Sequence, residues 1–168
     1  LRPLTMEHAT LLAQYANNTQ IAHRLTDAFP FPYTKEHAFD FIEQTSQHNP
    51  RCVHAIVADD AFVGCIGVYP QSDVWRYNAE MGYWLAQPFW GRGIMTMAIR
   101  QAVDYGWTAF PAIQRIFARP FGSNHGSARV LEKAGFQLEA RLSKTLFKAG
   151  VYEDELIYGI RRSDAQDK

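Results

Sequence analysis

The sequence predicts an α+β fold in which helices flank a mixed, mostly antiparallel central sheet of six to seven strands. Apolar residues recur at helical spacing in the N-terminal quarter and twice more in the C-terminal half, while β-branched and aromatic residues dominate the segments between. After a short opening strand, the order is two or three helices, three strands, a helix, a strand, a helix and two strands. With 168 residues, 47% of them hydrophobic, the chain can bury one core, so we expect a single domain over residues 1–168.

The opening strand is expected in LRPLT, and the first helix follows it directly. MEHATLLAQYANN carries apolar residues at helical spacing, and Asn17 and Asn18 are stop signals at its end. A second, short helix is expected over residues 19–25.

An aromatic loop separates these helices from the next one. The two prolines of AFPFPYT exclude a helix and favour an ordered loop. Thr34, at its end, can cap a helix over residues 35–47, because a threonine hydroxyl accepts from the first free backbone N–H groups. Ala38, Phe39 and Ile42 are the predicted buried stripe of that helix.

Extended segments begin after Pro50. Residues 52–70 are β-branched and aromatic on both sides of a polar turn at Asp59–Asp60, which predicts a hairpin. The remaining strands are expected over 78–86 and 115–121 and in a closing hairpin over 135–161. A helix ending at Gly135 as its C-cap precedes this hairpin.

The two cysteines are expected to be reduced and buried. A turn at Asp59–Asp60 would place Cys65 opposite His54, with Cys52 offset, so a disulfide between the two cysteines would be strained or absent. Two cysteines are too few for a disulfide framework, and they show no metal-ligand spacing. We therefore predict no metal site.

Composition excludes several classes of protein. Seventeen basic and seventeen acidic residues cancel, which disfavours a general nucleic-acid binder because such proteins carry a basic excess. No apolar run reaches the roughly 18 residues that a membrane span needs. The sequence shows no charged-then-apolar leader, so a cytoplasmic protein is expected. It begins with Leu1 rather than Met, so we expect a few native residues to precede it.

The turn Gly91-Arg92-Gly93 opens a long apolar helix and suggests an anion site. Backbone N–H groups at a helix start point outward, and the positive end of the helix dipole favours phosphate there. Alone, the turn is also compatible with a purely structural helix start, and it matches neither the dinucleotide nor the Walker A pattern. We expect the helix over 93–107 to be buried on most of its surface, because its polar residues form one narrow stripe: Thr96, Arg100, Asp104 and Thr108.

Two motifs together resemble the GCN5-related N-acetyltransferases (GNAT), within them the ribosomal-protein-alanine, RimJ/RimL-type branch. They are AEMGYWLAQPFWGRGIMTMAI and, about thirty residues later, SNHGSARVLEKAGF; LRPLT and GVYEDELIYGI support them. The resemblance spans essentially the whole chain. It implies the GNAT fold, with a sheet splayed between the strands before and after the glycine-turn helix. It also implies acetyl-CoA as cofactor and acetyl transfer to a primary amine. Trp90 and Met95 depart from the superfamily pattern, which has Gln or Arg and Gly or Ala there.

The resemblance assigns cofactor-binding residues on three segments. The pyrophosphate is expected on the turn and the helix start, the pantetheine along the strand before them, and the sulfur near the Asn-x-x-Ser motif. For Asn124 the alternative is a helix cap. The expected residues are Gly91, Arg92, Gly93, Ile94, Met95 and Thr96, then Trp84, Leu85 and Ala86, then Asn124 and Ser127.

Direct acetyl transfer needs a group that accepts the amine proton, donors for the developing oxyanion and an acid near the leaving thiolate. Glu80 is the candidate base or ammonium-steering group, with a salt-bridged strand glutamate as its alternative. Ser127 is the candidate acid, with helix capping as its alternative. Tyr83 and Tyr152 are further hydroxyls, although strand tyrosines often only pack. Nearby His125 matches no motif position and is expected to be an exposed loop residue.

The acceptor is expected between the aromatic loop and the last hairpin. Phe29, Phe31 and Tyr33 are the candidate walls, with Tyr83 beside them, and Asp154 is a candidate attractor of an ammonium group. Covering the core is the alternative for the aromatic loop. The oligomeric state is expected to be monomer or homodimer.

Three functions remain open from the sequence. The first is acetylation of a protein or peptide N-terminus. The second is acetylation of a small molecule, such as an aminoglycoside, a polyamine or an amino acid, since one fold serves all of these. The third is a non-catalytic acetyl-CoA-binding module.

Overall fold

A computed structural model describes residues 1–163, so the last five residues of the predicted domain lie outside the described part. One seven-stranded sheet has the order β1-β2-β3-β4-β5-β7-β6. Only β4 and β5 are parallel, which confirms the mixed, mostly antiparallel prediction. The strands are β1 (Arg2–Pro3), β2 (Val53–Ala58), β3 (Ala61–Pro70), β4 (Asn78–Leu85), β5 (Arg115–Ala118), β6 (Gln137–Lys148) and β7 (Val151–Arg161).

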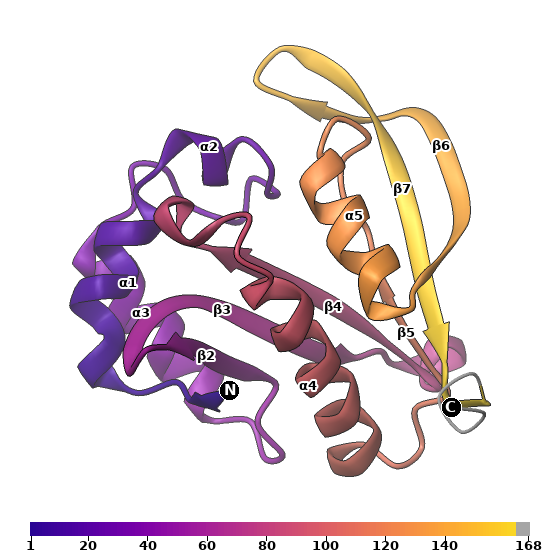
Figure 1. Cartoon of the computed structure of the whole chain (residues 1–168), viewed down its shortest axis with the longest axis horizontal. Helices are drawn as coiled ribbons and strands as arrows, with labels where there is room; N and C mark the ends of the chain where they lie inside the picture. Colours follow the sequence, from indigo (N-terminus) through magenta and orange to yellow (C-terminus); the bar gives the residue numbers. More distant parts are fainter. Residues whose placement is uncertain (164–168) are drawn as a thin grey trace.

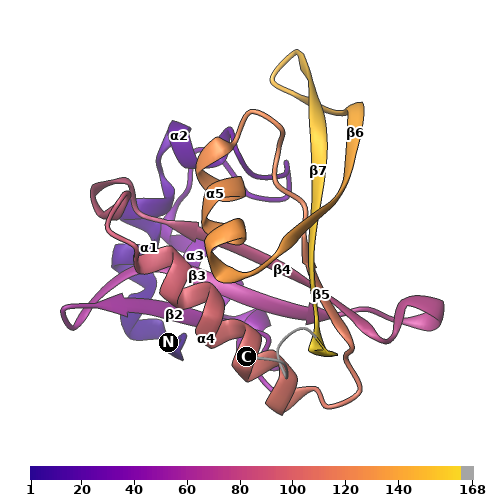
Figure 2. The same cartoon turned by 45° about the vertical axis from the view of Figure 1, so that its right-hand side comes forward.

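Helices cover both faces of the sheet (Figures 1 and 2). One buried cluster joins the sheet to α4 and α5 around Ile99, Ile116 and Leu131, all fully buried. A second joins the other face to α1 and α3 around Leu12 and Ile42. The helices are α1 (Ala9–Ala16), α2 (Thr19–Ala22), α3 (Lys35–Ser46), α4 (Ile94–Ala109) and α5 (His125–Ala134), with short 3-10 turns η1 (Met6–His8), η2 (Asp73–Trp75) and η3 (Gln87–Phe89).

The predicted helix ends are largely present, and one predicted buried stripe is wrong at a single position. Thr34 caps α3 through a capping box, and Gly135 ends α5 in the left-handed region. Ala38 and Ile42 are buried as predicted, but Phe39 is 46% exposed. Thr45 completes the stripe instead, because positions 38, 42 and 45 share one face of a helix.

Two further helix predictions are corrected. The second helix ends at Ala22 rather than at residue 25, and α4 continues to Ala109 rather than ending at 107. The solvent-facing side of α4 is also wider than its predicted polar stripe. Met97 is 59% exposed, and Gln101 next to it is exposed as well. Helix α4 therefore buries one face rather than most of its surface.

The β2–β3 hairpin turns at Asp59 and Asp60, both with positive φ, as the sequence predicts. Its register differs from the prediction, since Cys65 pairs with Ala55 rather than with His54. A bulge is the cause: Val57 pairs with Phe62 but Ile56 with Gly64, so β3 carries one extra residue. Both cysteines are free and buried, as expected.

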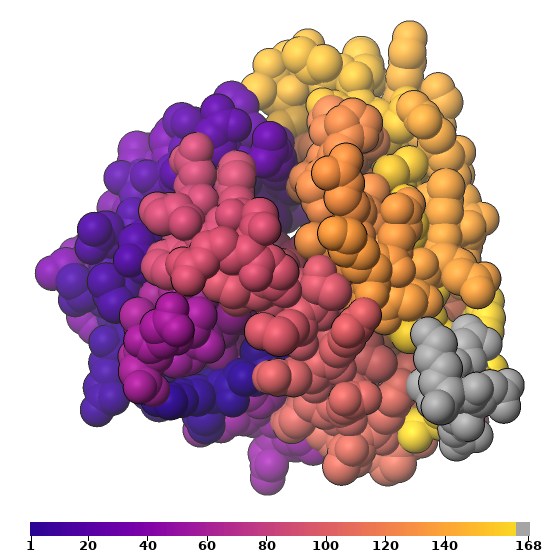
Figure 3. Space-filling view, in the orientation of Figure 1, coloured from indigo at the N-terminus to yellow at the C-terminus, as the bar shows by residue number. Residues whose placement is uncertain are grey.

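The sheet opens between β4 and β5, which confirms the predicted splay. Their parallel pairing covers only three residue pairs, ending at Glu80 and Phe117. Beyond that point β4 continues to Leu85, while the chain leaves β5 after Ala118 towards α5. Strands β4 and β5 diverge beyond this point (Figure 1). A hollow lies on the surface between the turn into α4 and the start of α5 (Figure 3).

Candidate active site

The glycine turn lies at the opening of the splayed sheet and has the backbone that its sequence demands. Gly91 and Gly93 have φ of 75° and 76°, in the left-handed region that favours glycine. A Cβ at either position would meet no atom within 4 Å. Backbone conformation and open space, rather than packing, therefore explain the two glycines, and that space is available to a ligand.

Six consecutive backbone N–H groups at this turn are left for such a ligand. Within residues 1–163, no group accepts a hydrogen bond from the N–H of residues 91–96, although the next amide, that of Met97, donates to Gly93 O at 3.2 Å. A helix start leaves four such groups, and here the turn adds two more. Together with the positive end of α4, this arrangement can hold a phosphate group.

The side chains around the turn point away from these amides. Arg92 Nη2 lies 3.5 Å from Asp59 Oδ2, and the guanidinium lies 5.5 Å from the ring centre of Phe89. Trp90 Nε1 donates to Leu85 O at 2.7 Å. Trp90, the first departure from the family pattern, thus links the turn to the end of β4 through its side chain. Met95, the second departure, is a core residue, 7% exposed.

Tyr83 and Ser127 meet across the opening. Their hydroxyl oxygens are 2.7 Å apart, joining β4 to the first turn of α5. Burial raises the pKa of Tyr83 above its usual value, so its hydroxyl stays protonated at neutral pH. Asn124 Oδ1 accepts from the Ser127 N–H at 3.2 Å, so Asn124 does cap α5, while the hydroxyl of Ser127 is directed to Tyr83 rather than to a cap.

Glu80, the last residue of β4 that pairs with β5, is held by an arginine that sequence reasoning missed. Arg119 Nε lies 3.0 Å from Glu80 Oε1, and its Nη2 lies 3.3 Å from Oε2. The same guanidinium lies 3.5 Å from Glu155 Oε1 on β7. The Glu80 side chain is 30% exposed and that of Arg119 49% exposed, so an incoming cation can compete for this carboxylate.

The aromatic loop reaches the same face of the sheet, but its three aromatics differ. Phe29 lies 6.3 Å from the Trp84 ring and 5.0 Å from that of Tyr33. Tyr33 is 6% exposed and belongs to the core on this face, whereas Phe31 is 48% exposed. In this structure Tyr33 packs as part of the core, and Phe31 is the member of the group that is open to an acceptor.

Asp154 is engaged within the β6–β7 hairpin. Its Oδ1 accepts from the Lys144 N–H at 3.0 Å and its Oδ2 from Arg141 Nε at 2.7 Å. These two hydrogen bonds, that from Lys144 first, lower the pKa of Asp154. The carboxylate therefore supports the irregularity of β6 at Lys144, where φ is positive and the register with β7 shifts.

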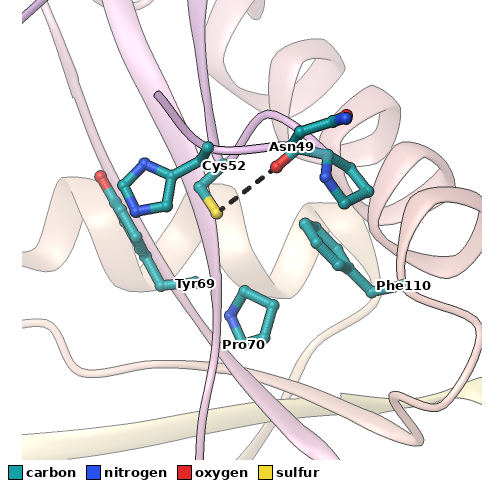
Figure 4. A pocket seen from close by; sticks show the side chains of 7 residues that line it. Asn49, Cys52, Tyr69, Pro70 and Phe110 are labelled. Atoms are coloured by element: carbon teal, nitrogen blue, oxygen red, sulfur yellow. Dashed lines mark hydrogen bonds between the residues drawn. The ribbon is translucent and has the colours of Figure 1, made fainter. Parts of the chain in front are cut away.

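One cavity of about 300 Å³ lies apart from the opening and another lies near it. The first lies where β2 begins and β3 ends, away from the opening; Cys52 faces it beside Tyr69, Pro70 and Phe110 (Figure 4). The second, of about 320 Å³, lies between α2 and the tip of the β6–β7 hairpin, and charged side chains from both sides line it. No cluster of three or more potential metal-ligating side chains occurs in residues 1–163. No helix in that range has both the length and the apolar character of a membrane span.

Comparisons with known proteins agree with this geometry. Residues 1–137 match the family model of the acetyltransferase (GNAT) domain. The chain is 36% identical over 107 residues to the probable N-acetyltransferase YjcK of Bacillus subtilis, an alignment that covers 64% of this chain and 59% of YjcK. The aligned part of this chain thus spans less than two thirds of that relative.

Solved structures extend the comparison. The ribosomal-protein-S5-alanine acetyltransferase of Vibrio fischeri is 25% identical, with a TM-score of 0.80 over 97% of this chain and 92% of that one. The microcin C7 self-immunity acetyltransferase MccE, solved with acetyl-CoA and AMP, is also 25% identical, with a TM-score of 0.78 over 95% of this chain and 89% of that one.

The fold and the family model define an acetyltransferase (GNAT) domain. The chain belongs to the GNAT acetyltransferase family, in its RimJ/RimL-type branch. Its domain is accordingly an acetyl-CoA-dependent N-acetyltransferase domain.

Proposed function

We propose that this protein transfers the acetyl group of acetyl-CoA to the N-terminal amine of a polypeptide by direct attack. The observation that carries the proposal is the opening of the sheet beyond Glu80, with the six free amides of residues 91–96 at its entrance and the Tyr83–Ser127 pair inside it. An elongated thioester with a phosphate group near one end fits an opening of this kind.

The residues fit acetyl-CoA, which supplies an activated acyl group and a thiolate leaving group when bound. The amides of residues 91–96 would hold its pyrophosphate. The edge of β4 that faces β5 has no strand partner beyond Glu80, so Leu85 can offer a backbone group there to the pantetheine amides. The expectation for Ala86 is corrected, because its N–H donates to Val63 O at 2.8 Å and its carbonyl accepts from the Phe89 N–H at 3.0 Å. Trp84 pairs with Cys65 in the same antiparallel alternation, so its backbone groups also face β3. Because Leu85 O already accepts from Trp90, the contribution of Leu85 rests on its N–H.

Acid catalysis is assigned to the Ser127 hydroxyl, supported by Tyr83. Their hydroxyls share one hydrogen bond of 2.7 Å, in which either oxygen can donate. A protonated Tyr83 that donates to Ser127 leaves the serine proton free for the departing sulfur. Backbone N–H groups on the free edge of β4 are the candidate oxyanion donors.

Glu80 is assigned to the acceptor amine. Its carboxylate attracts the ammonium group and takes its proton, directly or through water, so that a neutral amine attacks. Arg119 occupies the same two carboxylate oxygens, and Glu155 lies within reach of the same guanidinium. Binding of the ammonium group would therefore release Arg119 towards Glu155.

A polypeptide acceptor is favoured by two observations. The Vibrio fischeri relative is named for a ribosomal protein, S5. The hairpin tip and the aromatic loop also expose large apolar side chains: Phe31, Phe147, Val151 and Tyr152. A small polar amine would not need such a surface, whereas a peptide chain can cover it.

A CoA-release assay tests this function across three acceptor sets: N-terminal peptides, polyamines and aminoglycosides. We expect turnover with peptides, and Glu80→Gln should lower kcat/KM roughly ten- to a hundred-fold through the lost charged contact. Glu43→Gln, an exposed glutamate on α3, is the matched control. Tight acetyl-CoA binding without turnover on any amine would contradict the proposal, and turnover on polyamines alone would replace its acceptor.

A further inference from the structure

The cavity between α2 and the β6–β7 hairpin is lined by a cation, Arg24, that forms no ion pair within residues 1–163. His23 and Arg24, which follow α2, line one side of it, and Ser123, Lys148 and Glu153 line the other. Neither acetyl transfer nor the family motifs assign a role to these residues.

The charges of the far side are already engaged. Lys148 Nζ lies 2.6 Å from Asp27 Oδ1, and its side chain is only 16% exposed. Glu153 Oε1 accepts from the Ser123 hydroxyl at 2.9 Å. The lysine and the glutamate therefore each have a polar partner at the hairpin.

Arg24 differs from them. No carboxylate among the described residues pairs with it. Its guanidinium lies over the face of Trp90, whose ring centre is 5.2 Å from Arg24 Cζ. A guanidinium over an aromatic ring is oriented by the ring, while the N–H groups at its rim stay free for a planar or tetrahedral anion. The cation is thus positioned, and its hydrogen-bond donors are available.

Trp90 links this arginine to the glycine turn. The indole is fixed by its 2.7 Å hydrogen bond to Leu85 O, and Gly91 is the next residue. Arg92, the turn's own cation, is directed to Asp59 instead. Where the superfamily pattern has a glutamine or an arginine, this chain has a tryptophan whose ring contacts Arg24, two residues after the end of α2.

We propose that the α2 side of this cavity is an anion subsite, in which Arg24, supported by Trp90, binds a phosphate or carboxylate group. Two sources supply that chemistry in an acetyltransferase: a phosphate of the acyl donor, or an acidic side chain close to the amine of the acceptor. The subsite rests on the proposed function for its ligands, but its binding test needs no turnover.

Arg24→Gln removes the charge and keeps much of the side chain. Arg76→Gln is a matched control, because Arg76 also lies over an aromatic ring, Tyr77, at 5.0 Å. Arg76 is on the connection between β3 and β4, which projects away from α2 and the hairpin tip (Figure 2). Arg24→Lys, which keeps the charge, should retain part of the binding that Arg24→Gln loses.

Two sets of measurements distinguish a phosphate of the donor from a carboxylate of the acceptor. The first measures the Kd of acetyl-CoA by calorimetry and compares the KM of acetyl-CoA with that of acetyl-pantetheine, which carries no phosphate group. The second compares the KM of peptides with Asp or Asn after the first residue. For a donor phosphate, Arg24→Gln should weaken acetyl-CoA roughly ten-fold and leave acetyl-pantetheine unchanged. For an acceptor carboxylate, it should raise the KM of the Asp peptide alone by a similar factor.

Either of these results supports the subsite. If Arg24→Gln matches Arg76→Gln within two-fold for acetyl-CoA and for the Asp peptide, the subsite is wrong, while the proposed function stands on its own assay. If the wild-type protein does not bind acetyl-CoA, the proposed function fails, and the donor form of the subsite fails with it.

Discussion

Arg119 Nε lies 3.0 Å from Glu80 Oε1 at the point where β4 and β5 separate, so the candidate base is bound by an internal cation. An acceptor ammonium group must compete with that guanidinium. We expect Arg119→Gln to lower the KM of the amine and also kcat, because Glu80 gains attraction for a cation but loses its fixed orientation. Steady-state kinetics with a peptide series measures both constants.

The same substitution should have a small effect on folding. Both side chains of the Glu80–Arg119 pair are partly exposed, and such pairs contribute about 0–1 kcal/mol. Urea unfolding of Arg119→Gln therefore separates a kinetic from a structural role. Unchanged KM and kcat in a stable variant would show that Arg119 does not control Glu80.

The glycine turn gives a second prediction. Gly93→Val should weaken acetyl-CoA binding at least ten-fold, because the side chain both strains the left-handed backbone and covers the free amides. Gly150→Ala is the control for strain alone: Gly150 also has a positive φ with open space around it, at the tip of the last hairpin. Calorimetry should show a loss of acetyl-CoA affinity only for Gly93→Val. Equal affinity in both variants would mean that the phosphate does not bind at this turn.

The third prediction concerns the two sides of α3. Ile42 is 2% exposed and Phe39 is 46% exposed. Ile42→Ala should therefore lower the free energy of unfolding by about 2–4 kcal/mol, whereas Phe39→Ala should change it by less than about 1 kcal/mol. Chemical denaturation of the two variants checks this order, and a larger loss at Phe39 would mean that its face is covered in solution.

The features that could be predicted from the sequence are those with local causes. The turn at Asp59–Asp60 and the cap at Thr34 depend on residues within a few positions of each other, and so does the left-handed backbone of Gly91 and Gly93. The Gln or Arg of the superfamily pattern is absent, yet the backbone that the pattern requires is present.

The features that could not be predicted depend on contacts between distant segments. Glu80 and Arg119 are 39 residues apart, and only the β4–β5 pairing brings them together. The bulge in β3 shifts the partner of Cys65 from His54 to Ala55. Gly64 lies at this bulge, but a glycine within a strand does not by itself fix which residue is extra. Tyr33 was expected at the acceptor because it lies in an aromatic loop, and only the packing of α1 and α3 shows that its side chain is buried.

Alkaline pH should destabilise the fold. Burial raises the pKa of Cys65, which is 3% exposed, and of Tyr33, far above the values of the unfolded chain, about 9 and 10. Above those values the unfolded state loses protons that the folded state keeps, so stability is fully present below about pH 9 and falls as the pH rises. Urea midpoints from pH 7 to 11 measure the fall, and Cys65→Ala should remove its earliest part. A flat profile in the wild-type protein would contradict the burial of these groups.

The Tyr83–Ser127 pair gives the last prediction, because it separates an acid from a structural contact. If Ser127 protonates the leaving thiolate and Tyr83 supports it, Ser127→Ala should lower kcat roughly a hundred-fold and Tyr83→Phe by a smaller factor, both with little change in the Kd of acetyl-CoA. A donor with a more acidic thiol needs less protonation, so an aryl thioester should restore most of the rate in Ser127→Ala. If the hydrogen bond only joins β4 to α5, both variants should instead lose stability and acetyl-CoA affinity together, and no thioester should restore the rate. Single-turnover kinetics with the two donors, beside thermal unfolding of each variant, distinguishes these outcomes.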